Sequence, residues 1–174
     1  VSFGEAEDGS LYLSSATRGI LLLSDGELQS EPAFSINEGM NDAWYDPATN
    51  GQGVLVSVFP VGGTMFLAWF TFDVERPPDD AVAILGEPGH RWVTAAGSYS
   101  GNSATLEAFI SSGGVFDSPD PPVGEPEPHG TITITWTDCN SAMLSYDMPS
   151  TGPGSVALQR VALDNVALCE ALQT

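Results

Sequence analysis

The chain contains no lysine, and its four arginines stand against 23 acidic residues, which gives a formal net charge of −19 at pH 7. A surface of this sign repels phosphate backbones and anionic lipids, so nucleic acids and membrane surfaces are excluded as partners. Two interpretations of the acidity stay open. One is solubility in a salty medium, and the other is attraction of divalent cations by hard oxygen ligands.

Long hydrophobic runs are also missing. No apolar stretch approaches the ~20 residues that span a bilayer, so no membrane span is expected. A signal peptide is absent too, and the chain begins at Val1 rather than Met. We therefore expect a piece processed or excised from a larger precursor. With 174 residues and 42% apolar content, the chain has the size of one domain, or of one domain plus an appendage.

Cysteine is scarce, with Cys139 and Cys169 as the only two. An even number in a lysine-free chain rich in strand signals favours an exported protein with one disulfide, located outside the cell or in a periplasm. The bridge would close a loop of about 30 residues and contribute on the order of 3–4 kcal/mol to stability. Two buried free thiols are an alternative. A metal pair is a third, although no suitably spaced histidine joins them.

Strand signals are abundant. Residues 43–72, AWYDPATNGQGVLVSVFPVGGTMFLAWFTF, indicate three strands, because aromatic and β-branched runs broken by Gly, Asn and Pro are typical of antiparallel hairpins. Ile132, Ile134 and Trp136 alternate with threonines, as in a half-buried strand. The stretch 64–72 is apolar on both faces, which predicts a central strand. Two strands are expected near the N-terminus, at about 10–14 and 18–23. Eight are expected in the main body, at 43–46, 52–59, 64–73, 91–99, 103–112, 130–138, 141–147 and 154–163.

Short strands joined by local turns predict an all-β antiparallel meander. A barrel-like up-and-down fold and a two-sheet sandwich both fit, and the local connections favour the barrel. We expect residues 1–30 to form an N-terminal β-hairpin, 31–42 a linker, and 43–174 the antiparallel β domain. A short helix is expected at 164–172, with Asp164 as its N-cap.

The N-terminal stretch carries F-G-E, then D-G, then L-Y-L, then G-I, between Phe3 and Ile20. Residues 1–25 thereby resemble the closing strands of a six-bladed propeller of the secreted glucose/sorbosone dehydrogenase type. The resemblance implies that the chain is the C-terminal fragment of a propeller-type oxidoreductase. The cofactor and catalytic residues of that family would then lie in blades not present here.

Residues 40–163 carry W-Y-D-P-x-T-N-G-Q-G, then G-G-T-M-F-x-A-W-F-T-F-D, then R-W, then G-T-I-T-I-T-W-x-D-C-N-S-A, then S-V-A-L-Q-R. This series resembles an uncharacterised β domain common in secreted proteobacterial proteins, often at the C-terminal end of larger extracellular enzymes. The resemblance implies export and an accessory or binding role, with no assigned chemistry. The chain departs from the pattern at GHRWVTAAG, which follows a longer, proline-rich approach in place of G-x-W-x-x-G.

Catalytic and cofactor motifs are missing. GSYSG at 97–101 has the glycine spacing of a nucleophile elbow but a tyrosine at its centre. His90 and His129 are too few for a zinc motif, and no phosphate-binding loop occurs. No catalytic residue is therefore expected. Calcium is the cofactor left open. Asp46 with Asn50, and Asp117 with Asp120, flank turns that also offer carbonyl oxygens, although EF-hand spacing is absent.

Exposed aromatics supply the leading functional hypothesis. Trp44 and Trp92 stand at strand starts beside polar turns, where an indole is able to lie half exposed, and Tyr45 is adjacent. Aromatic platforms on a rigid sheet stack on the apolar faces of sugar rings. We expect a non-catalytic binding domain in which these three side chains contact an extracellular glycan or protein, with a core position as the alternative for each. A further alternative is a structural subunit that self-assembles through sheet edges.

Overall fold

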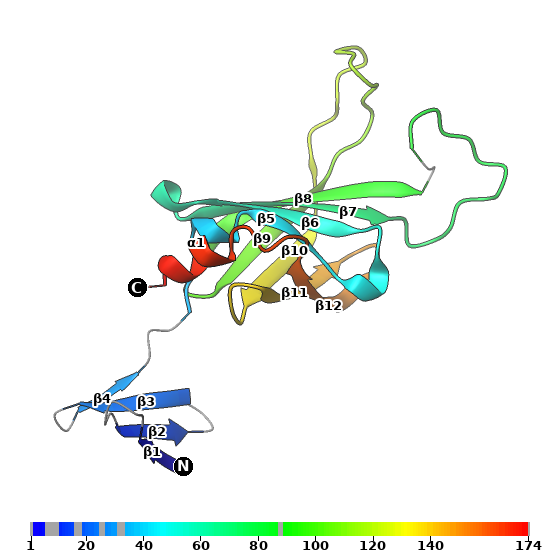
Figure 1. The fold of residues 1–174 in the computed structure, drawn as a ribbon. Coiled ribbons are helices and arrows are strands. Elements are labelled where there is room, and N and C mark those ends of the chain that lie inside the picture. Colours follow the sequence, from blue (N-terminus) through cyan, green and yellow to red (C-terminus); the bar gives the residue numbers. More distant parts are fainter. Residues whose placement is uncertain are drawn as a thin grey trace. The chain divides into compact units, whose positions relative to one another are not determined.

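The computed structural model describes the backbone of residues 2–5, 11–15, 19–24, 27–30, 34–86 and 89–173. The chain divides into two compact units, Val1–Ala33 together with Thr174, and Phe34–Gln173. Figure 1 shows strands in both units and a short helix near the C-terminus. The predicted all-β class is confirmed.

The described part of the N-terminal unit consists of four strands: β1 (Ser2–Glu5), β2 (Leu11–Ser15), β3 (Gly19–Ser24) and β4 (Glu27–Ser30). They pair antiparallel in chain order. The predicted hairpin corresponds to β2 and β3. The structure adds one strand on each side of this hairpin, which the sequence did not indicate. A four-stranded antiparallel sheet has the size of a propeller blade, and the propeller resemblance stays a prediction.

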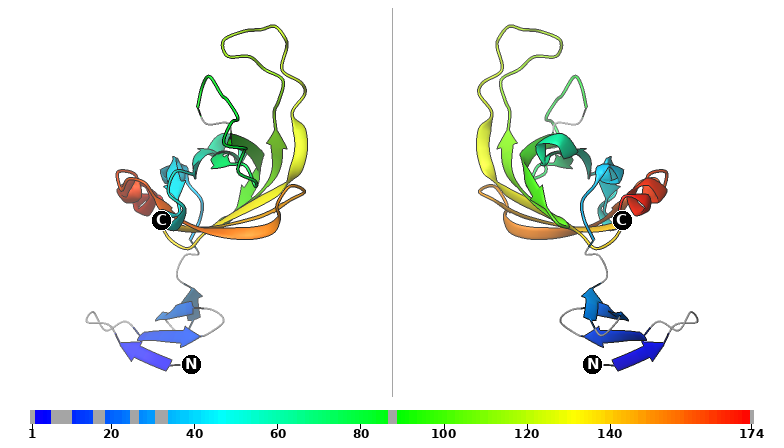
Figure 2. Two further views of the ribbon diagram at one scale, coloured as in Figure 1. Left: turned by 90° about the vertical axis from the view of Figure 1, so that its right-hand side faces the viewer. Right: turned by 90° about the vertical axis from the view of Figure 1, so that its left-hand side faces the viewer.

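The second unit is a closed eight-stranded barrel, seen along its axis in Figure 2. Its strands are β5 (Asp42–Tyr45), β6 (Gly53–Phe59), β7 (Thr64–Phe72), β8 (His90–Ser100), β9 (Ser103–Ile110), β10 (Glu127–Trp136), β11 (Ser141–Met148) and β12 (Gly152–Arg160). Each strand pairs antiparallel with the next. The last strand pairs with the first through Gln159↔Tyr45 and Arg160↔Trp44. The up-and-down barrel prediction is confirmed, and the sandwich alternative is excluded.

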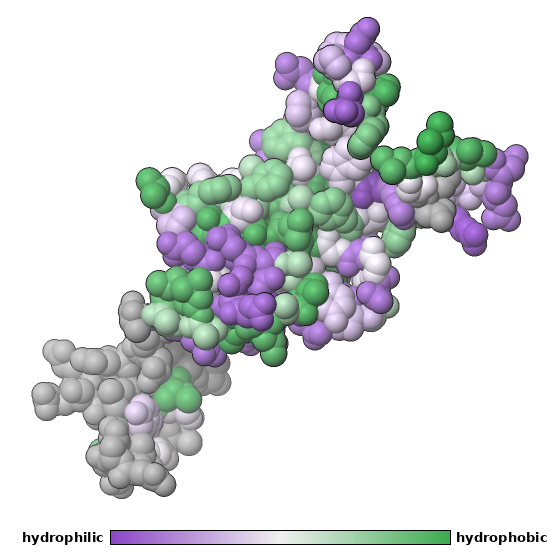
Figure 3. Space-filling view, turned by 45° about the horizontal axis from the view of Figure 1, so that its top comes forward, coloured by the Kyte–Doolittle hydropathy of each residue, from purple (hydrophilic) through white to green (hydrophobic). Residues whose placement is uncertain are grey.

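Alternation along each strand decides which residues form the core. Ile132 and Ile134 of β10 are buried inside the barrel, while Thr131, Thr133 and Thr135, which alternate with them, face outward. In β7, Leu67 points inward, whereas Phe66 and Phe70 are 38% and 51% exposed on the outer surface. Figure 3 shows hydrophobic residues gathered over this side of the barrel. β7 has a neighbour on each edge, β6 and β8, as expected of a central strand, but only one of its two apolar faces is buried, because the other face of a barrel strand points outward.

The connections alternate between the two ends of the barrel. The β6–β7 turn with the 3-10 helix η3 (Pro60–Gly62), the β8–β9 turn and the β10–β11 turn lie at one end. The 3-10 helix η1 (Glu38–Met40) and helix α1 (Val166–Ala171) lie there too, and we call it the closed end. The β5–β6 turn with η2 (Pro47–Thr49), the long β7–β8 and β9–β10 loops and the β11–β12 turn form the open end.

Part of the segment expected as a linker belongs to the closed end. Ile36 is buried in the core, and η1 packs directly against α1. The approach is so close that a Cβ added to Gly39 would lie 2.4 Å from backbone atoms of Cys169. Residues 34–42 are thus part of the barrel unit and not a connection to it, whereas 31–33 lie outside the described residues.

The disulfide Cys139–Cys169 ties α1 to the β10–β11 turn, with 5.8 Å between the two Cα atoms. It confirms the predicted bridge and removes the free-thiol and metal-pair alternatives. The helix begins after Asn165 rather than after Asp164, and the Asn165 side chain donates to the carbonyl oxygen of Asn41 at 2.8 Å instead of capping the helix. In the part of the chain that the structure describes, no helix is long and apolar enough to cross a membrane.

A buried arginine connects the elements of the closed end. The Arg160 guanidinium forms an ion pair with Asp42 at 2.7 Å and donates to the carbonyl oxygens of Gly39 and Cys139. It also lies over the Trp44 ring, 4.4 Å from the ring centroid, which is a cation–π distance. The charge is therefore compensated inside the barrel, which a buried cation requires.

Candidate functional site

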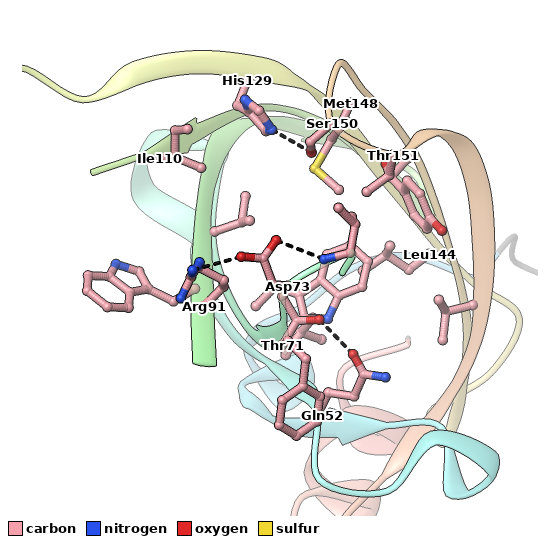
Figure 4. A pocket seen from close by; sticks show the side chains of 18 of the residues that line it. Gln52, Thr71, Asp73, Arg91, Ile110, His129, Leu144, Met148, Ser150 and Thr151 are labelled. Carbon is pink, nitrogen blue, oxygen red and sulfur yellow. Dashed lines mark hydrogen bonds and ion pairs between the residues drawn. The ribbon is translucent and has the colours of Figure 1, made fainter. Parts of the chain in front are cut away.

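The barrel interior is not filled at its open end. A cavity of ≈ 590 Å³ lies there, lined mainly by inward-facing residues of the strands and by adjoining residues of the surrounding connections; Phe72 and Trp92 also contribute to its lining. Figure 4 looks into it. Small-molecule sites typically measure about 300–1,000 Å³ and occur in the mouths of β-barrels. The cavity is therefore the candidate functional site.

The inner part of the cavity is apolar. Trp69 of β7 and Tyr146 of β11 meet across the barrel, with ring centroids 5.4 Å apart and ring planes inclined at 59°. Val93, Leu144 and Leu158 contribute further apolar wall. Trp69 and Tyr146 pack on the core yet are only partly buried. Apolar surface thus continues from the core into the open cavity.

A glycine in β12 makes room for one of these rings. Gly154 pairs directly with Tyr146 across the β11–β12 ladder. A Cβ added to Gly154 would lie 2.3 Å from the Tyr146 hydroxyl oxygen. A larger residue at this position would displace the tyrosine ring from the cavity wall.

The outer part of the cavity is polar, as Figure 4 shows. The Thr71 hydroxyl donates to the Gln52 side-chain oxygen at 2.6 Å. Asp73 forms an ion pair with Arg91 at 2.7 Å and accepts a hydrogen bond from the Val74 N–H at 2.9 Å. On the opposite side, His129 Nε2 and the Ser150 hydroxyl are hydrogen-bonded at 2.8 Å. These groups form a ring of polar side chains, which we call the rim.

The expected exposure of Trp44 is wrong. Trp44 is fully buried at the closed end, where its indole N–H donates to the carbonyl oxygen of Met40 at 3.2 Å and its ring packs edge-on against Trp136. The register of β5 with its neighbours turns this side chain inward. A position beside a polar turn says nothing about which face of the strand a residue occupies.

Trp92 is 56% exposed on the outside of β8, as expected for a contact residue. Trp92 pairs with Phe70 of β7, and the next aromatic residue on the outer side of β7 is Phe72, which is 46% exposed. We call Phe66, Phe70, Phe72 and Trp92 the outer aromatic face. Tyr45 is half-buried on β5 and is not part of this face. The structure therefore does not bring the three predicted contact residues together, and their contact with a ligand stays a prediction.

Two of the four candidate calcium ligands, Asp46 and Asn50, use their side chains for local contacts with the backbone. The Asp46 carboxylate accepts from the Ala48 N–H at 2.8 Å, and the Asn50 side-chain oxygen accepts from the Gly51 N–H at 3.1 Å.

The other two candidates, Asp117 and Asp120, lie on the exposed β9–β10 loop. Among the described residues, no group of three or more His, Cys, Asp or Glu side chains is placed to hold a metal ion. Calcium binding stays a prediction.

Sequence reasoning missed the cavity itself, although β7 carried a signal for it. Once Leu67 is assigned to the core, the period of two places Trp69, Thr71 and Asp73 on the same face. That face changes from apolar to polar towards the end of the strand. This change indicates the mouth of a cavity only if the sheet closes into a barrel. The position of Tyr146 on the opposite wall follows only from the register of all eight strands.

No family model matches the chain, and neither a curated protein nor a solved structure shows significant similarity to it.

Proposed function

We propose that the barrel is a non-catalytic binding domain that holds a small, mainly apolar molecule in the cavity at its open end. The observation that carries the proposal is the cavity of ≈ 590 Å³ with apolar walls and a polar rim. An eight-stranded barrel has an interior that either is filled by side chains or holds one small ligand. Here side chains fill the closed end, and the open end leaves a cavity of a size that suits one small ligand.

The aromatic pair in the cavity supports this role. Trp69 and Tyr146 leave part of their apolar surface unburied in a concave site. Covering such surface is favourable by about 25 cal/mol per Å². A ligand seated on the pair would gain this free energy without requiring the barrel to rearrange.

An exported location is part of the proposal. The disulfide Cys139–Cys169 supports it, because such bridges persist in oxidising compartments.

The first test uses N-phenyl-1-naphthylamine, a neutral apolar dye whose fluorescence rises in apolar surroundings. We expect saturable binding of one dye per chain, with energy transfer from Trp69. In Val156→Trp, a large side chain from β12 fills the cavity, and binding should fall at least tenfold.

The matched control is Ala157→Trp, because Ala157 neighbours Val156 on β12 and faces outward. This variant should bind like the parent, with circular dichroism reporting the fold of both. Non-saturable dye binding, or equal binding by the two variants, would refute the proposal.

Glycan binding is the second candidate, and the exposed pair of Trp92 and Phe70 favours it. Titration with soluble neutral polysaccharides, with and without calcium, should change the tryptophan fluorescence in a saturable way that Trp92→Ala abolishes. Thr94→Ala, two residues along β8, is the control. A flat response over the panel would reject this candidate. Concentration-dependent light scattering would then favour a self-assembling structural subunit.

A further inference from the structure

The chemical character of the cavity changes in one direction along the strands that line it. On β7 the inward residues run from Leu67 and Trp69 to Thr71, and Asp73 follows at the mouth. On β11 they run from Leu144 and Tyr146 to Met148, with Ser150 in the turn beyond. Opposite walls thus show the same order, apolar inside and polar outside. An occupant that satisfies both zones is amphipathic and enters with its apolar end first.

The connections at the open end carry a strong negative charge. The described part of the β7–β8 loop carries Asp73, Glu75, Asp79 and Asp80, and the stretch 117–127 after β9 carries four more acidic residues. Of the acidic residues, Asp46 and Asp73 line the cavity itself. Charge of one sign around a cleft with low-dielectric walls raises the local concentration of oppositely charged solutes.

The arginines of this end are held by carboxylates. Arg91 pairs with Asp73 at 2.7 Å, and Arg76 lies 3.5 Å from Asp79. Arg160 is buried at the closed end with Asp42 and does not reach the mouth. The cations at the open end therefore offset part of its acidity and leave it negative.

From the change of polarity along the cavity and the net negative charge at the open end we infer the class of ligand. This inference rests on the proposed function. The cavity accepts a small amphipathic cation, such as an alkyl ammonium compound. Its apolar chain lies against Trp69 and Tyr146, and its charged group stays at the acidic rim. Anionic amphiphiles such as fatty carboxylates are disfavoured at the same site.

The test is displacement of N-phenyl-1-naphthylamine by three compounds with the same eight-carbon chain: octyltrimethylammonium, octanol and octanoate. At pH 7.5 and low salt, we expect the ammonium compound to displace the dye at a concentration at least tenfold below that of octanoate, with octanol between them. Raising the sodium chloride concentration to 0.5 M should narrow this ratio, because salt screens exposed charges.

Asp73→Asn removes one carboxylate and leaves the Arg91 charge in place. The preference for the ammonium compound should therefore weaken, so that the concentrations of the ammonium compound and of octanoate needed to displace the dye become more similar. Asp138→Asn makes the same charge change in the exposed β10–β11 turn at the closed end and should leave the ratio as in the parent.

The outcomes separate the two claims. Equal displacement by the cation and the anion, or stronger displacement by octanoate, overturns the inference while dye binding upholds the proposed function. A chain that binds no dye overturns both.

Discussion

At the closed end Trp44, Trp136 and Arg160 fill the barrel, whereas at the open end Trp69 and Tyr146 stand in the same interior and leave a cavity of ≈ 590 Å³. The two ends are built from the same eight strands. They differ in what holds the large side chains. Those at the closed end are fixed by buried hydrogen bonds, an ion pair and a disulfide, and those at the open end by partly exposed contacts.

This difference separates stability from recognition. When a buried polar group loses its hydrogen-bond partner, its own desolvation is no longer compensated, whereas an exposed group forms a hydrogen bond with water instead. Substitutions at the closed end should therefore lower the free energy of unfolding, and substitutions at the open end should alter binding with little effect on stability.

The largest contrast is expected between two arginines. Arg160→Met leaves the half-buried Asp42 carboxylate and two carbonyl oxygens without their partner, so the free energy of unfolding should fall by about 4 kcal/mol. Arg91→Met breaks an ion pair whose side chains are 50% and 36% exposed, and it should cost about 0–1 kcal/mol. Urea unfolding followed by tryptophan fluorescence measures both. Similar losses in the two variants would show that the ends are not distinct in this sense.

The disulfide should come next. Replacing Cys139 and Cys169 together by serine should lower the free energy of unfolding by about 3–4 kcal/mol, because the unfolded chain regains the freedom of a loop of about 30 residues. Dye binding at 20 °C should persist in the double variant, since the cavity lies at the other end. Loss of binding in a chain that still shows native circular dichroism would contradict the separation of the ends.

Two glycines provide a matched pair. In Gly39→Ala the new methyl group meets the backbone of Cys169, which cannot yield without moving α1, and we expect a loss of about 2–3 kcal/mol. In Gly154→Ala the methyl group meets the hydroxyl end of Tyr146, a side chain able to rotate, so the loss should stay below about 1 kcal/mol. Dye affinity should fall in Gly154→Ala alone. Thermal unfolding and dye titration of both variants test whether one substitution mainly lowers stability and the other mainly lowers dye affinity.

The smallest expected effect separates the two buried tryptophans. The Trp44 indole N–H donates to the carbonyl oxygen of Met40, while that of Trp136 has no hydrogen-bond acceptor among the described residues. Trp44→Phe should therefore cost about 1–2 kcal/mol more than Trp136→Phe, since it orphans a buried acceptor and removes a ring from beneath Arg160. If urea unfolding shows equal losses of free energy of unfolding in the two variants, the loss would come only from the smaller volume of the phenylalanine side chain.

Local patterns predicted most of the fold. The alternation through Ile132, Ile134 and Trp136 and the turn residues between strands located all eight strands to within a few residues, because strand formation and hairpin turns depend on neighbours in the chain. The disulfide followed from the cysteine count. The N-terminal sheet was underestimated, since two of its four strands lack a strong local signal.

The candidate site depended on contacts that no local pattern reports. Trp44 and Trp69 are equally aromatic and both point inward, yet one lies beneath Arg160 and the other beside an open cavity. The distinction arises from residues more than 70 positions away in the sequence, Arg160 for the first and Tyr146 with Gly154 for the second. Only the closure of the barrel brings these partners together.

Closure also leaves a seam. In the described part of the chain the β12–β5 ladder consists of Gln159↔Tyr45 and Arg160↔Trp44, continued by the hydrogen bond from the Val161 N–H to the Ala43 carbonyl oxygen, whereas the β7–β8 ladder runs from Thr64↔Ser98 to Phe72↔His90. The sheet is closed, but the ladder between β12 and β5 is short. Arg160 lies at this ladder and connects the two strands through its ion pair with Asp42. Amide hydrogens along β5 and the end of β12 should exchange with solvent before those of β7 and β8. Local unfolding of the barrel should therefore begin with the separation of β12 from β5.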